Sequence, residues 1–302
     1  MELGIALPTM GVEASPDAIT YIAQTAERMG YASVWTFERL LRPLHPVGVD
    51  GQTVAPMRES YRLAYDPIDT LAFVAGTTSR IKLGTSVVDA LFHPPVVLAR
   101  RFATLDQLSG GRVIAGLGQG SNVDEFVTAN VPYKRRGAGF EEYLQAVRAV
   151  WAPDPVQFEG RFYHIPESEI GPKPVQVGGP PIIIGGSAPR AIERAARLAD
   201  GINPGSGAGI ERLQQIIDGY ERALRLAGRD RKRQMVVVRA NTNLTTAPLP
   251  EPRQFLSGDA AQVSADMQQL AKLGVDHLFF DLNYAVIPVT EQVELLNHLP
   301  RL

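Results

Sequence analysis

The stretch TLDQLSGGRVIAGLGQG, Thr104 to Gly120, says most about the fold. It reads as the end of an amphipathic helix, a turn at Gly110-Gly111, a short apolar strand and the glycine-rich exit Gly116-Leu117-Gly118-Gln119-Gly120. Glycine has no side chain, so the backbone at this strand end allows close approach by a flat or phosphorylated ligand. We therefore predict that Gly118 and Gln119 contact a cofactor. The glycine spacing differs from the dinucleotide-binding fingerprint G-x-G-x-x-G, which argues against a dinucleotide site.

A second segment repeats this arrangement later in the chain. In PPIIIGGSAPRAIERAARLADG, Pro180 to Gly201, an apolar strand stops at Gly185-Gly186 and a helix opens near Ser187. Amide N–H groups at the start of a helix form a ready anion site. We predict that Gly185, Gly186 and Ser187 bind a phosphate, with Ser206 in the next loop, Pro204 to Gly207, closing on it. An ordinary strand-to-helix turn is the alternative.

Strands and helices alternate along the whole sequence. The strands are expected at 3–8, 33–37, 81–88, 113–117, 182–185, 201–203, 235–240 and 277–281. The helices are expected at 16–29, 66–78, 94–108, 139–151, 189–199, 210–227, 259–273 and 290–299. Eight such units favour an α/β fold of the (β/α)₈ TIM-barrel type, and 302 residues suit one such domain spanning 1–302. An open doubly wound sheet is the alternative.

Three segments exceed a minimal barrel. Residues 38–65 follow the second strand, 152–179 follow the fourth helix and include an expected hairpin at 156–165, and 241–258 are rich in proline. Loops of this length in a compact domain are commonly functional. The first leaves the carboxyl end of a strand, where barrel enzymes hold their chemistry, so we interpret it as a substrate lid. A surface insertion is the alternative.

Composition excludes several classes of protein. The chain has no cysteine, which excludes disulfides, thiolate metal sites and a cysteine nucleophile. Its formal net charge of -2 does not suggest a nucleic-acid partner. No apolar run approaches the ~20 residues of a membrane span, and the N-terminus lacks a signal-peptide pattern. We expect a cytoplasmic protein with neither nucleic acid nor membrane as a partner.

In a parallel barrel the residues after each strand meet at one rim. Here they form a polar, glycine-rich set: Thr9, Glu38, Arg39, Ser86, Val87, Asp89, Gln119, Ser121, Asn122, Gly185, Gly186, Ser187, Asn203, Ser206, Asn241, Asp281 and Asn283. This set contains carboxylates but no histidine. His93 and His277 are not clustered with acids at ligand spacing, so we predict no metal site.

Further motifs add a family resemblance. They are MGYASVW at 29–35, RIKLGTSV at 80–87 and FEGRFY at 158–163. With the two glycine-rich strand ends, in this order and spacing, the chain resembles the luciferase-like flavin and deazaflavin oxidoreductases, most closely their actinobacterial F420-dependent branch. The resemblance implies a bacterial-luciferase-like barrel that binds F420 or FMN, and a double glycine, here Gly185-Gly186, at the cofactor phosphate. It also implies a non-prolyl cis peptide bond at Ser86-Val87, in a bulge behind the flavin ring.

Glu38 and Arg39 are the expected catalytic residues. Relatives often carry an acid followed by a histidine at this place, so the resemblance implies a role for Glu38, whereas Arg39 departs from the pattern. An arginine stays charged and cannot shuttle protons at neutral pH. It would stabilise a hydride-rich ring or pair with Glu38 instead. Ser121 stands where some sugar-phosphate relatives carry a catalytic acid, which argues against that substrate class.

The cationic run Lys134-Arg135-Arg136 bears on the choice of cofactor. It is either a solvated face or a site for an anionic tail. F420 carries a phosphodiester and a glutamate tail, whereas FMN carries a terminal phosphate only. We therefore predict an F420-dependent oxidoreductase that transfers a hydride between the cofactor and a small organic substrate. An FMN-dependent monooxygenase with a cofactor-reducing partner and a non-catalytic flavin-binding protein are the alternatives. Since relatives are often dimers, a homodimer is also left open.

Overall fold

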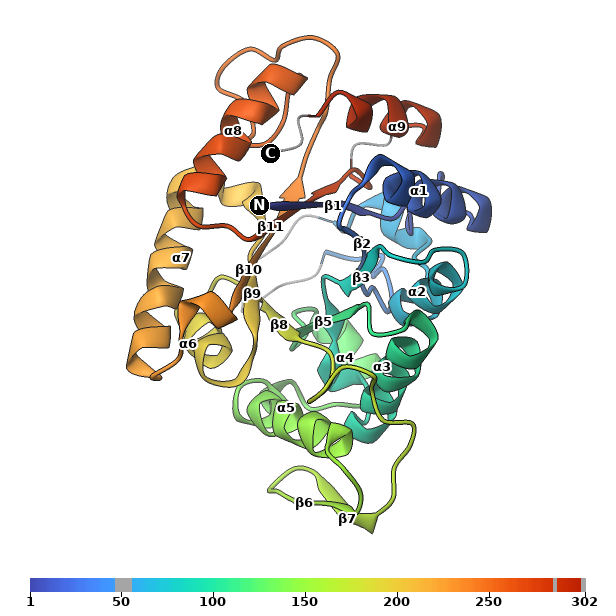
Figure 1. Cartoon of the computed structure of the whole chain (residues 1–302), viewed down its shortest axis with the longest axis vertical. Coiled ribbons are helices and arrows are strands. Elements are labelled where there is room, and N and C mark those ends of the chain that lie inside the picture. The colour runs from blue at the N-terminus through green and yellow to red at the C-terminus, as the bar shows by residue number, and fades with distance from the viewer. Residues whose placement is uncertain (47–55, 285–286, 300–302) are drawn as a thin grey trace.

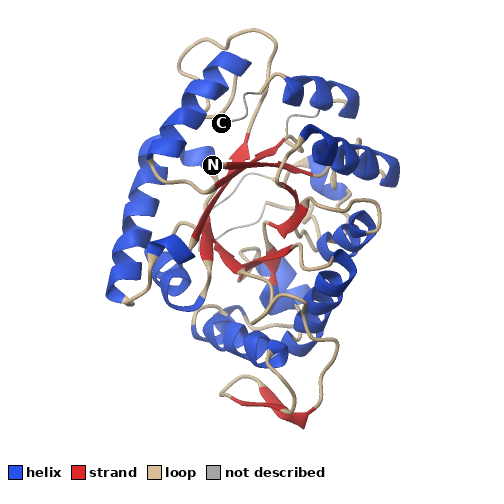
Figure 2. Ribbon diagram, viewed as in Figure 1, coloured by secondary structure: helices blue, strands red, loops and turns tan. Residues whose placement is uncertain are grey.

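The strands close into a parallel barrel that helices surround (Figures 1 and 2). The computed structural model describes residues 1–46, 56–284 and 287–299. The strands run in the order β3-β2-β1-β11-β10-β9-β8-β5-β4, and a further β3–β5 pairing closes the ring. Their bounds are β1 (Glu2–Ala6), β2 (Ser33–Thr36), β3 (Lys82–Thr85), β4 (Val88–Asp89), β5 (Val113–Gly118), β8 (Ile182–Gly185), β9 (Gly201–Asn203), β10 (Met235–Asn241) and β11 (His277–Asp281). The predicted (β/α)₈ barrel is confirmed, and the open sheet is excluded.

The helices begin and end close to where the sequence predicted. They are α1 (Pro16–Met29), α2 (Pro67–Ala75), α3 (Pro95–Ser109), α4 (Val123–Thr128), α5 (Ala138–Trp151), α6 (Pro189–Leu198), α7 (Gly209–Leu226), α8 (Ala260–Lys272) and α9 (Val289–Asn297). The Ser15 hydroxyl accepts the Ala18 N–H at 3.1 Å, and Gly30 ends α1 with φ 79°. A serine N-cap and a left-handed glycine at the end are common ways to complete the hydrogen bonds of helix ends. Short α4 was not predicted.

Two apolar layers fill the molecule. Inside the barrel, Trp35 stacks on Phe279 with ring centroids 4.7 Å apart. This inner cluster contains Ala6, Trp35, Ile114, Ile183, Val237 and Phe279. A larger cluster lies between the strands and the helices. Because side chains pack the interior, any ligand has to bind at an end of the barrel.

At the amino end of the strands, a chain of hydrogen bonds includes the buried His277. Its Nε2 lies 2.6 Å from the Ser33 hydroxyl, which accepts the Trp35 indole N–H, and its Nδ1 lies 3.1 Å from a Glu2 carboxylate oxygen. Burial lowers the pKa of His277, and the hydrogen bond from His277 lowers the pKa of Glu2 to about 2. Ser33 is fully buried, so this chain is an internal support of the barrel.

The insertions take two forms. The predicted hairpin is confirmed as antiparallel β6 (Val156–Glu159) and β7 (His164–Ser168), which project away from the barrel (Figure 1). In the expected lid, a short 3₁₀ helix, η1 (Glu59–Arg62), lies next to the mouth of the barrel. Residues 47–55 of that segment lie outside the described residues.

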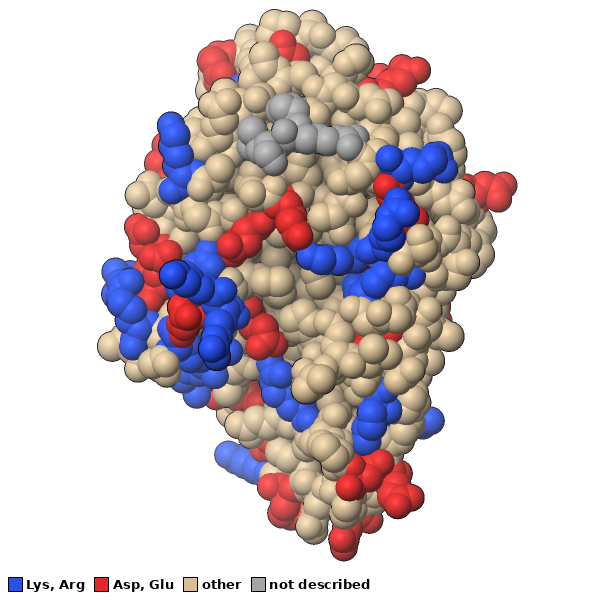
Figure 3. Space-filling model, in the orientation of Figure 1, with Lys and Arg blue, Asp and Glu red and all other residues tan. Residues whose placement is uncertain are grey.

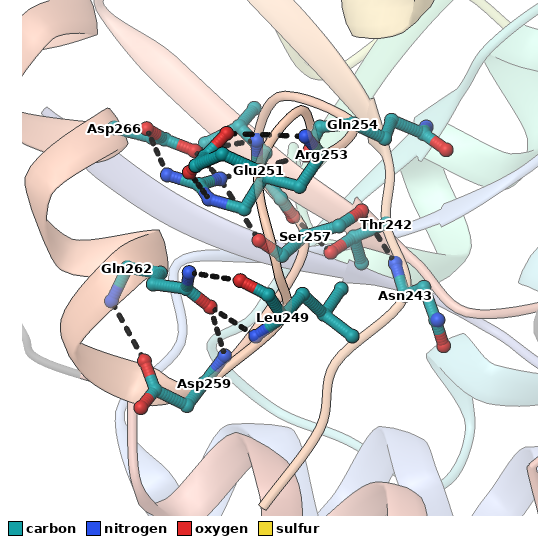
Figure 4. A network of polar contacts seen from close by, with 11 residues as sticks. Thr242, Asn243, Leu249, Glu251, Arg253, Gln254, Ser257, Asp259, Gln262 and Asp266 are labelled. Carbon is teal, nitrogen blue, oxygen red and sulfur yellow. Dashed lines mark hydrogen bonds and ion pairs between the residues drawn. The ribbon is translucent and has the colours of Figure 1, made fainter. Parts of the chain in front are cut away.

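The proline-rich loop between β10 and α8 is tied down by polar contacts (Figure 4). Arg253 donates to both carboxylate oxygens of Asp266 at 2.6 and 2.9 Å, and the Leu256 N–H donates to the same carboxylate at 2.7 Å. The Gln262 side chain accepts the Leu249 N–H and donates to the Leu249 carbonyl. These hydrogen bonds and this ion pair therefore fix the loop against α8.

The surface in Figure 3 carries both signs of charge. Basic and acidic side chains are interspersed over this face, and the densest basic group lies where Figure 1 places α6 and α7. No single-sign field covers this side of the molecule. Among the described residues, no helix combines the length and the apolar character that crossing a membrane requires.

Candidate functional site

A cis peptide bond marks the carboxyl end of the barrel. The Ser86–Val87 bond is cis, as the resemblance implied. It lies between β3 and the short β4, which pairs with β5. The Val87 side chain enters the mouth and packs on Gly118 and Gly185: a Cβ would lie 2.6 Å from Val87 Cγ2 at the first and 2.9 Å from Cγ1 at the second. Gly118 and Gly185, two of the predicted cofactor residues, therefore leave space for the side chain of Val87, which is a third.

The glycine-rich end of β5 serves protein packing. A Cβ at Gly116 would lie 1.7 Å from the Thr85 carbonyl oxygen. A Cβ at Gly120 would lie 2.8 Å from Phe92 and 2.9 Å from Phe126. The sequence assigned this bare backbone to a ligand, but protein atoms fill the space beside these glycines. Because protein atoms fill the space beside Gly118, its predicted contact with a cofactor would involve backbone atoms.

A half-buried arginine holds the Ser86 carbonyl at this bond. Arg239 Nη1 donates to the Ser86 carbonyl at 3.0 Å, and Nε donates to Asp281 at 2.9 Å. Burial opposes the charge, but Asp281 raises the pKa of Arg239, so the guanidinium stays charged. The Ser86 hydroxyl donates to Asn203 at 2.5 Å. Sequence reasoning missed Arg239, although a charged residue inside the apolar run VVVRA was a usable signal.

Beside this arginine is a polar pocket of about 550 Å³. Its lining combines amides, hydroxyls and one arginine: Arg58, Tyr61, Asn241, Thr242, Asn243, Gln254 and Tyr284. The hydroxyls of Tyr61 and Tyr284 lie 2.9 Å apart. The buried Asn241 Oδ1 has no hydrogen-bond partner in the described part of the chain. The lining of the pocket offers both hydrogen-bond donors and acceptors to a ligand.

Glu38 and Arg39 point to different partners. Glu38 accepts the Asp89 N–H at 2.6 Å, and its other oxygen lies 2.7 Å from His93 Nε2. Arg39 forms an ion pair with the fully buried Glu125 at 2.9 Å. The alternative that Arg39 pairs with Glu38 is therefore wrong. The expectation of a rim without histidine is also wrong, because the turn before α3 brings His93 onto Glu38.

Three acids thus meet around one arginine. Burial raises the pKa of Asp89 to about 7, and the nearby carboxylates of Glu38 and Glu125 add to this rise, while Arg39 opposes it. Burial also raises the pKa of Glu125, against the opposing effect of Arg39. Despite burial, Glu125 raises the pKa of Arg39. The cluster therefore carries a carboxyl group that changes charge near neutral pH.

The described residues contain no group of three or more histidine and acidic side chains that could hold a metal ion. Glu38 and His93 are two potential metal ligands that lie close together. However, the second Glu38 oxygen accepts a hydrogen bond from the Asp89 backbone N–H, which is a donor. A donor cannot bind a cation, so the hydrogen-bonded arrangement of Glu38 is that of a positioned carboxylate.

The loops after β8 and β9 expose bare backbone. Gly186 has φ 127°, and Gly185, Gly186 and Ser187 lead to the exposed start of α6. A Cβ at Gly205 or Gly207 would meet no atom within 4 Å. Ser206 is different from the prediction: its hydroxyl is buried and accepts the Asn241 N–H at 3.2 Å. The open space in this loop lies beside Gly205 and Gly207.

The cationic run lies on the same side of the mouth. Arg135 stacks over the Phe162 ring at 4.7 Å, so the hairpin turn supports it. The Gly137 N–H donates to the Gln119 side chain at 2.9 Å, which ties the end of the run to the end of β5. A Cβ at Gly137 would lie 4.0 Å from the Arg194 guanidinium of α6. The run therefore ends beside α6, the helix that follows the loop containing Gly186.

The comparisons with known proteins identify the family of the chain. Residues 1–246 match the model of a protein family described as "Luciferase-like monooxygenase". An uncharacterised protein of Mycobacterium tuberculosis is 34% identical over 206 residues, which is 67% of this chain and 71% of that protein. The F420-dependent glucose-6-phosphate dehydrogenase of Amycolatopsis mediterranei is 33% identical over 199 residues, which is 65% of this chain and 55% of that protein.

A solved structure extends the likeness over the whole fold. The monooxygenase RslO1 from Streptomyces bottropensis superposes with a TM-score of 0.79, covering 98% of each chain at 22% sequence identity. At this identity the superposition shows a shared fold. The predicted resemblance is confirmed.

Proposed function

The chain belongs to the luciferase-like monooxygenase family, whose members are F420- or flavin-dependent oxidoreductases, and from this premise we propose that it is an F420-dependent oxidoreductase. In our proposal it transfers a hydride between the deazaflavin and a small organic substrate. Since members of this family are enzymes, the alternative of a non-catalytic flavin-binding protein is set aside.

One observation carries the proposal: the packing of the Val87 side chain on two glycines at the mouth. The Val87 side chain is wedged between Gly118 and Gly185, and Arg239 holds the Ser86 carbonyl. These contacts fix Val87, so its side chain presents a rigid apolar surface to whatever lies in the mouth. A planar ring system fits against such a surface. When bound, the cofactor supplies the redox chemistry, and the protein supplies orientation and a dry pocket.

The phosphate would be held by Gly185, Gly186 and Ser187. Their exposed backbone leads to the N-terminus of α6, where N–H groups and the helix dipole favour an anion. Gly205 and Gly207 add open space beside them. Ser206 contributes indirectly in this proposal, because its hydroxyl holds the Asn241 N–H and so fixes the second loop.

The choice of F420 over FMN is supported by charge. The run Lys134-Arg135-Arg136 leads to Gly137, which lies beside Arg194 of α6, the helix that follows the proposed phosphate loop. An anionic tail that extends from the phosphate would meet these cations. The second candidate function is FMN-dependent oxygenation with a separate cofactor-reducing enzyme. It is favoured by the description of the matching family as monooxygenases.

We propose that the substrate enters beside the lid, Glu38 to Tyr65, whose described part places Tyr61 over Phe37 with ring centroids 6.2 Å apart. Ser121 is exposed at the end of β5 and carries no acid, so we propose a substrate other than a sugar phosphate, unlike the relative in Amycolatopsis.

The test begins with the spectrum of the ligand that the protein retains after mixing with F420 and with FMN. Reduced cofactor is then offered to a panel of carbonyl and enone acceptors, first without oxygen and then with it. The proposal expects retained F420 and oxygen-independent oxidation of the reduced deazaflavin. Retained FMN, with substrate conversion that requires oxygen, would establish the monooxygenase instead.

A further inference from the structure

Asp89 is the acid of the rim that the proposed cofactor site does not use. Its carboxylate accepts a hydrogen bond from the Gly120 backbone N–H, which opposes the rise in its pKa that burial causes. Asp89 follows the cis bulge by two residues and lies in β4, which pairs with β5. Ile114 belongs to the inner cluster, and Gly118, four residues later on β5, shares its face. A Cβ at Gly118 would lie 3.0 Å from Asp89 Oδ1 and 2.6 Å from Val87 Cγ2. The Asp89 carboxyl therefore faces the mouth beside Val87.

The surroundings of Asp89 disfavour its charge. Glu38 comes from the end of β2, with His93 on its far oxygen, and Glu125 comes from α4. Arg39 is the cation among these groups, and its hydrogen bond goes to Glu125. In the described residues, Asp89 forms no ion pair. A carboxyl beside two other acids, with their one arginine already engaged, binds a proton more tightly than usual.

The other acids cannot take this role. Glu125 is fully buried and accepts from Arg39 and from the Leu40 N–H at 3.0 Å. Glu38 has both oxygens engaged, by His93 and by the Asp89 N–H. Asp89 is the member that is only partly buried and faces the mouth. Its raised pKa, about 7, is matched to proton transfer near neutral pH.

We infer that Asp89 exchanges a proton with the substrate during hydride transfer, an inference that rests on the proposed function. In the reductive direction, a bound reduced deazaflavin would supply a hydride to the β-carbon of a conjugated enone. The electron pair of the carbon–carbon double bond moves toward the carbonyl, and the Asp89 carboxyl gives its proton to the resulting enolate. The enone would thus gain one hydride and one proton, while solvent would accept the ring proton that the deazaflavin loses on oxidation and would return a proton to Asp89. The oxidative direction reverses each step.

The first arm of the test uses the cofactor-free protein. Carboxyl ¹³C NMR of aspartate-labelled protein follows each side chain between pH 4 and 9, and Asp89→Asn identifies the signal of Asp89. We expect this signal to titrate near pH 7. Adding reduced F420, an anion, should raise its midpoint further, because like charges close together disfavour ionisation. An Asp89 that is ionised at pH 5, or a midpoint that bound F420 leaves unchanged, would overturn the inference.

The second arm measures single-turnover oxidation of reduced F420 by cyclohex-2-en-1-one. Asp89→Asn should lower the rate about a hundredfold at pH 7, the order expected for loss of a general acid, while F420 binding persists. The wild-type rate should fall as the pH rises through 7, and the variant should lack this dependence. Asp89→Glu should restore much of the rate. Asp218→Asn, on the exposed face of α7, makes the same chemical change elsewhere and should match the wild type.

The outcomes separate the two proposals. Wild-type rate and pH profile in Asp89→Asn would refute the proton role and leave the F420-dependent function standing. A wild type that binds no F420 would refute the proposed function, and the proton transfer to substrate with it. In that case, a titration midpoint near pH 7 for the Asp89 carboxyl of the cofactor-free protein would still show that the fold itself raises the pKa of Asp89.

Discussion

Gly186 is the residue on which phosphate binding should depend most. Its φ of 127° is a conformation that residues with a side chain rarely adopt, and its backbone is exposed at the start of α6. Gly186→Val should therefore shift this loop and weaken cofactor binding at least about tenfold, or about 1.4 kcal/mol. Fluorescence titration with F420 measures the change.

The matched control is Gly178→Val, since Gly178 also has a positive φ, 81°, and is exposed in the loop before β8. It should leave binding unchanged at a similar cost in stability. If folded Gly186→Val protein binds F420 and FMN with parental affinity, the phosphate lies elsewhere.

Arg39 is expected to act first through Glu125. Arg39→Ala leaves the fully buried Glu125 carboxylate without its cation, which should lower the free energy of unfolding by about 3 kcal/mol. Adding Glu125→Gln should recover part of that loss. Glu59→Gln breaks the ion pair of Arg42 with an exposed acid and should cost less than about 1 kcal/mol. Urea unfolding of the wild type and these three variants measures the free energies of unfolding.

A different result would restore the role that the sequence suggested. If Arg39→Ala keeps parental stability and loses affinity for reduced cofactor only, the guanidinium acts on the ring. The sequence placed Glu38 and Arg39 at the rim because they follow a strand. It gave no sign that their partners come from His93, 55 residues away, and from Glu125, 86 residues away. Such contacts depend on how the turns fold back over the mouth, which local patterns do not encode.

At the scale of elements, the loop between β10 and α8 should derive its order from Asp266. That carboxylate accepts two bonds from Arg253 and the buried Leu256 N–H (Figure 4). Asp266→Ala should cost about 3 kcal/mol of stability, because an arginine and a buried N–H lose their partner together. Hydrogen exchange at the Leu256 amide should accelerate. Glu251→Gln removes the exposed partner of Arg253 and should change little. Unchanged exchange in Asp266→Ala would show that apolar packing holds the loop.

The sequence predicted elements well wherever they are long and periodic. The eight barrel strands and eight surrounding helices are found close to their expected ranges, because each helix has an apolar face and clear end signals such as Ser15 and Gly30. It missed α4, since six residues are too few for a helical period to show. It also assigned the glycines of β5 to a ligand, because a missing side chain looks the same whether protein or ligand fills the space.

At the scale of the whole molecule, Asp89 should make stability depend on pH. Its pKa is about 7 in the fold, above the unfolded value of about 4. The folded state therefore binds the extra proton between these values, and this contribution to stability is complete below about pH 4 and lost as the pH rises through 7. Asp89→Asn cannot ionise, so its melting temperature relative to wild type should rise between pH 5 and pH 8. Asp218→Asn should show a constant difference, and a constant difference in Asp89→Asn would contradict the raised pKa.

The central claim is that this barrel binds a deazaflavin in preference to a flavin. The most direct measurement is equilibrium titration of the ligand-free protein with F420 and with FMN at matched ionic strength, repeated at higher salt. We predict tighter binding of F420, with a preference that shrinks as salt rises, because charges such as Lys134 are screened beyond about 8 Å at physiological ionic strength. Tighter binding of FMN at every salt concentration, or binding of neither, would contradict the account.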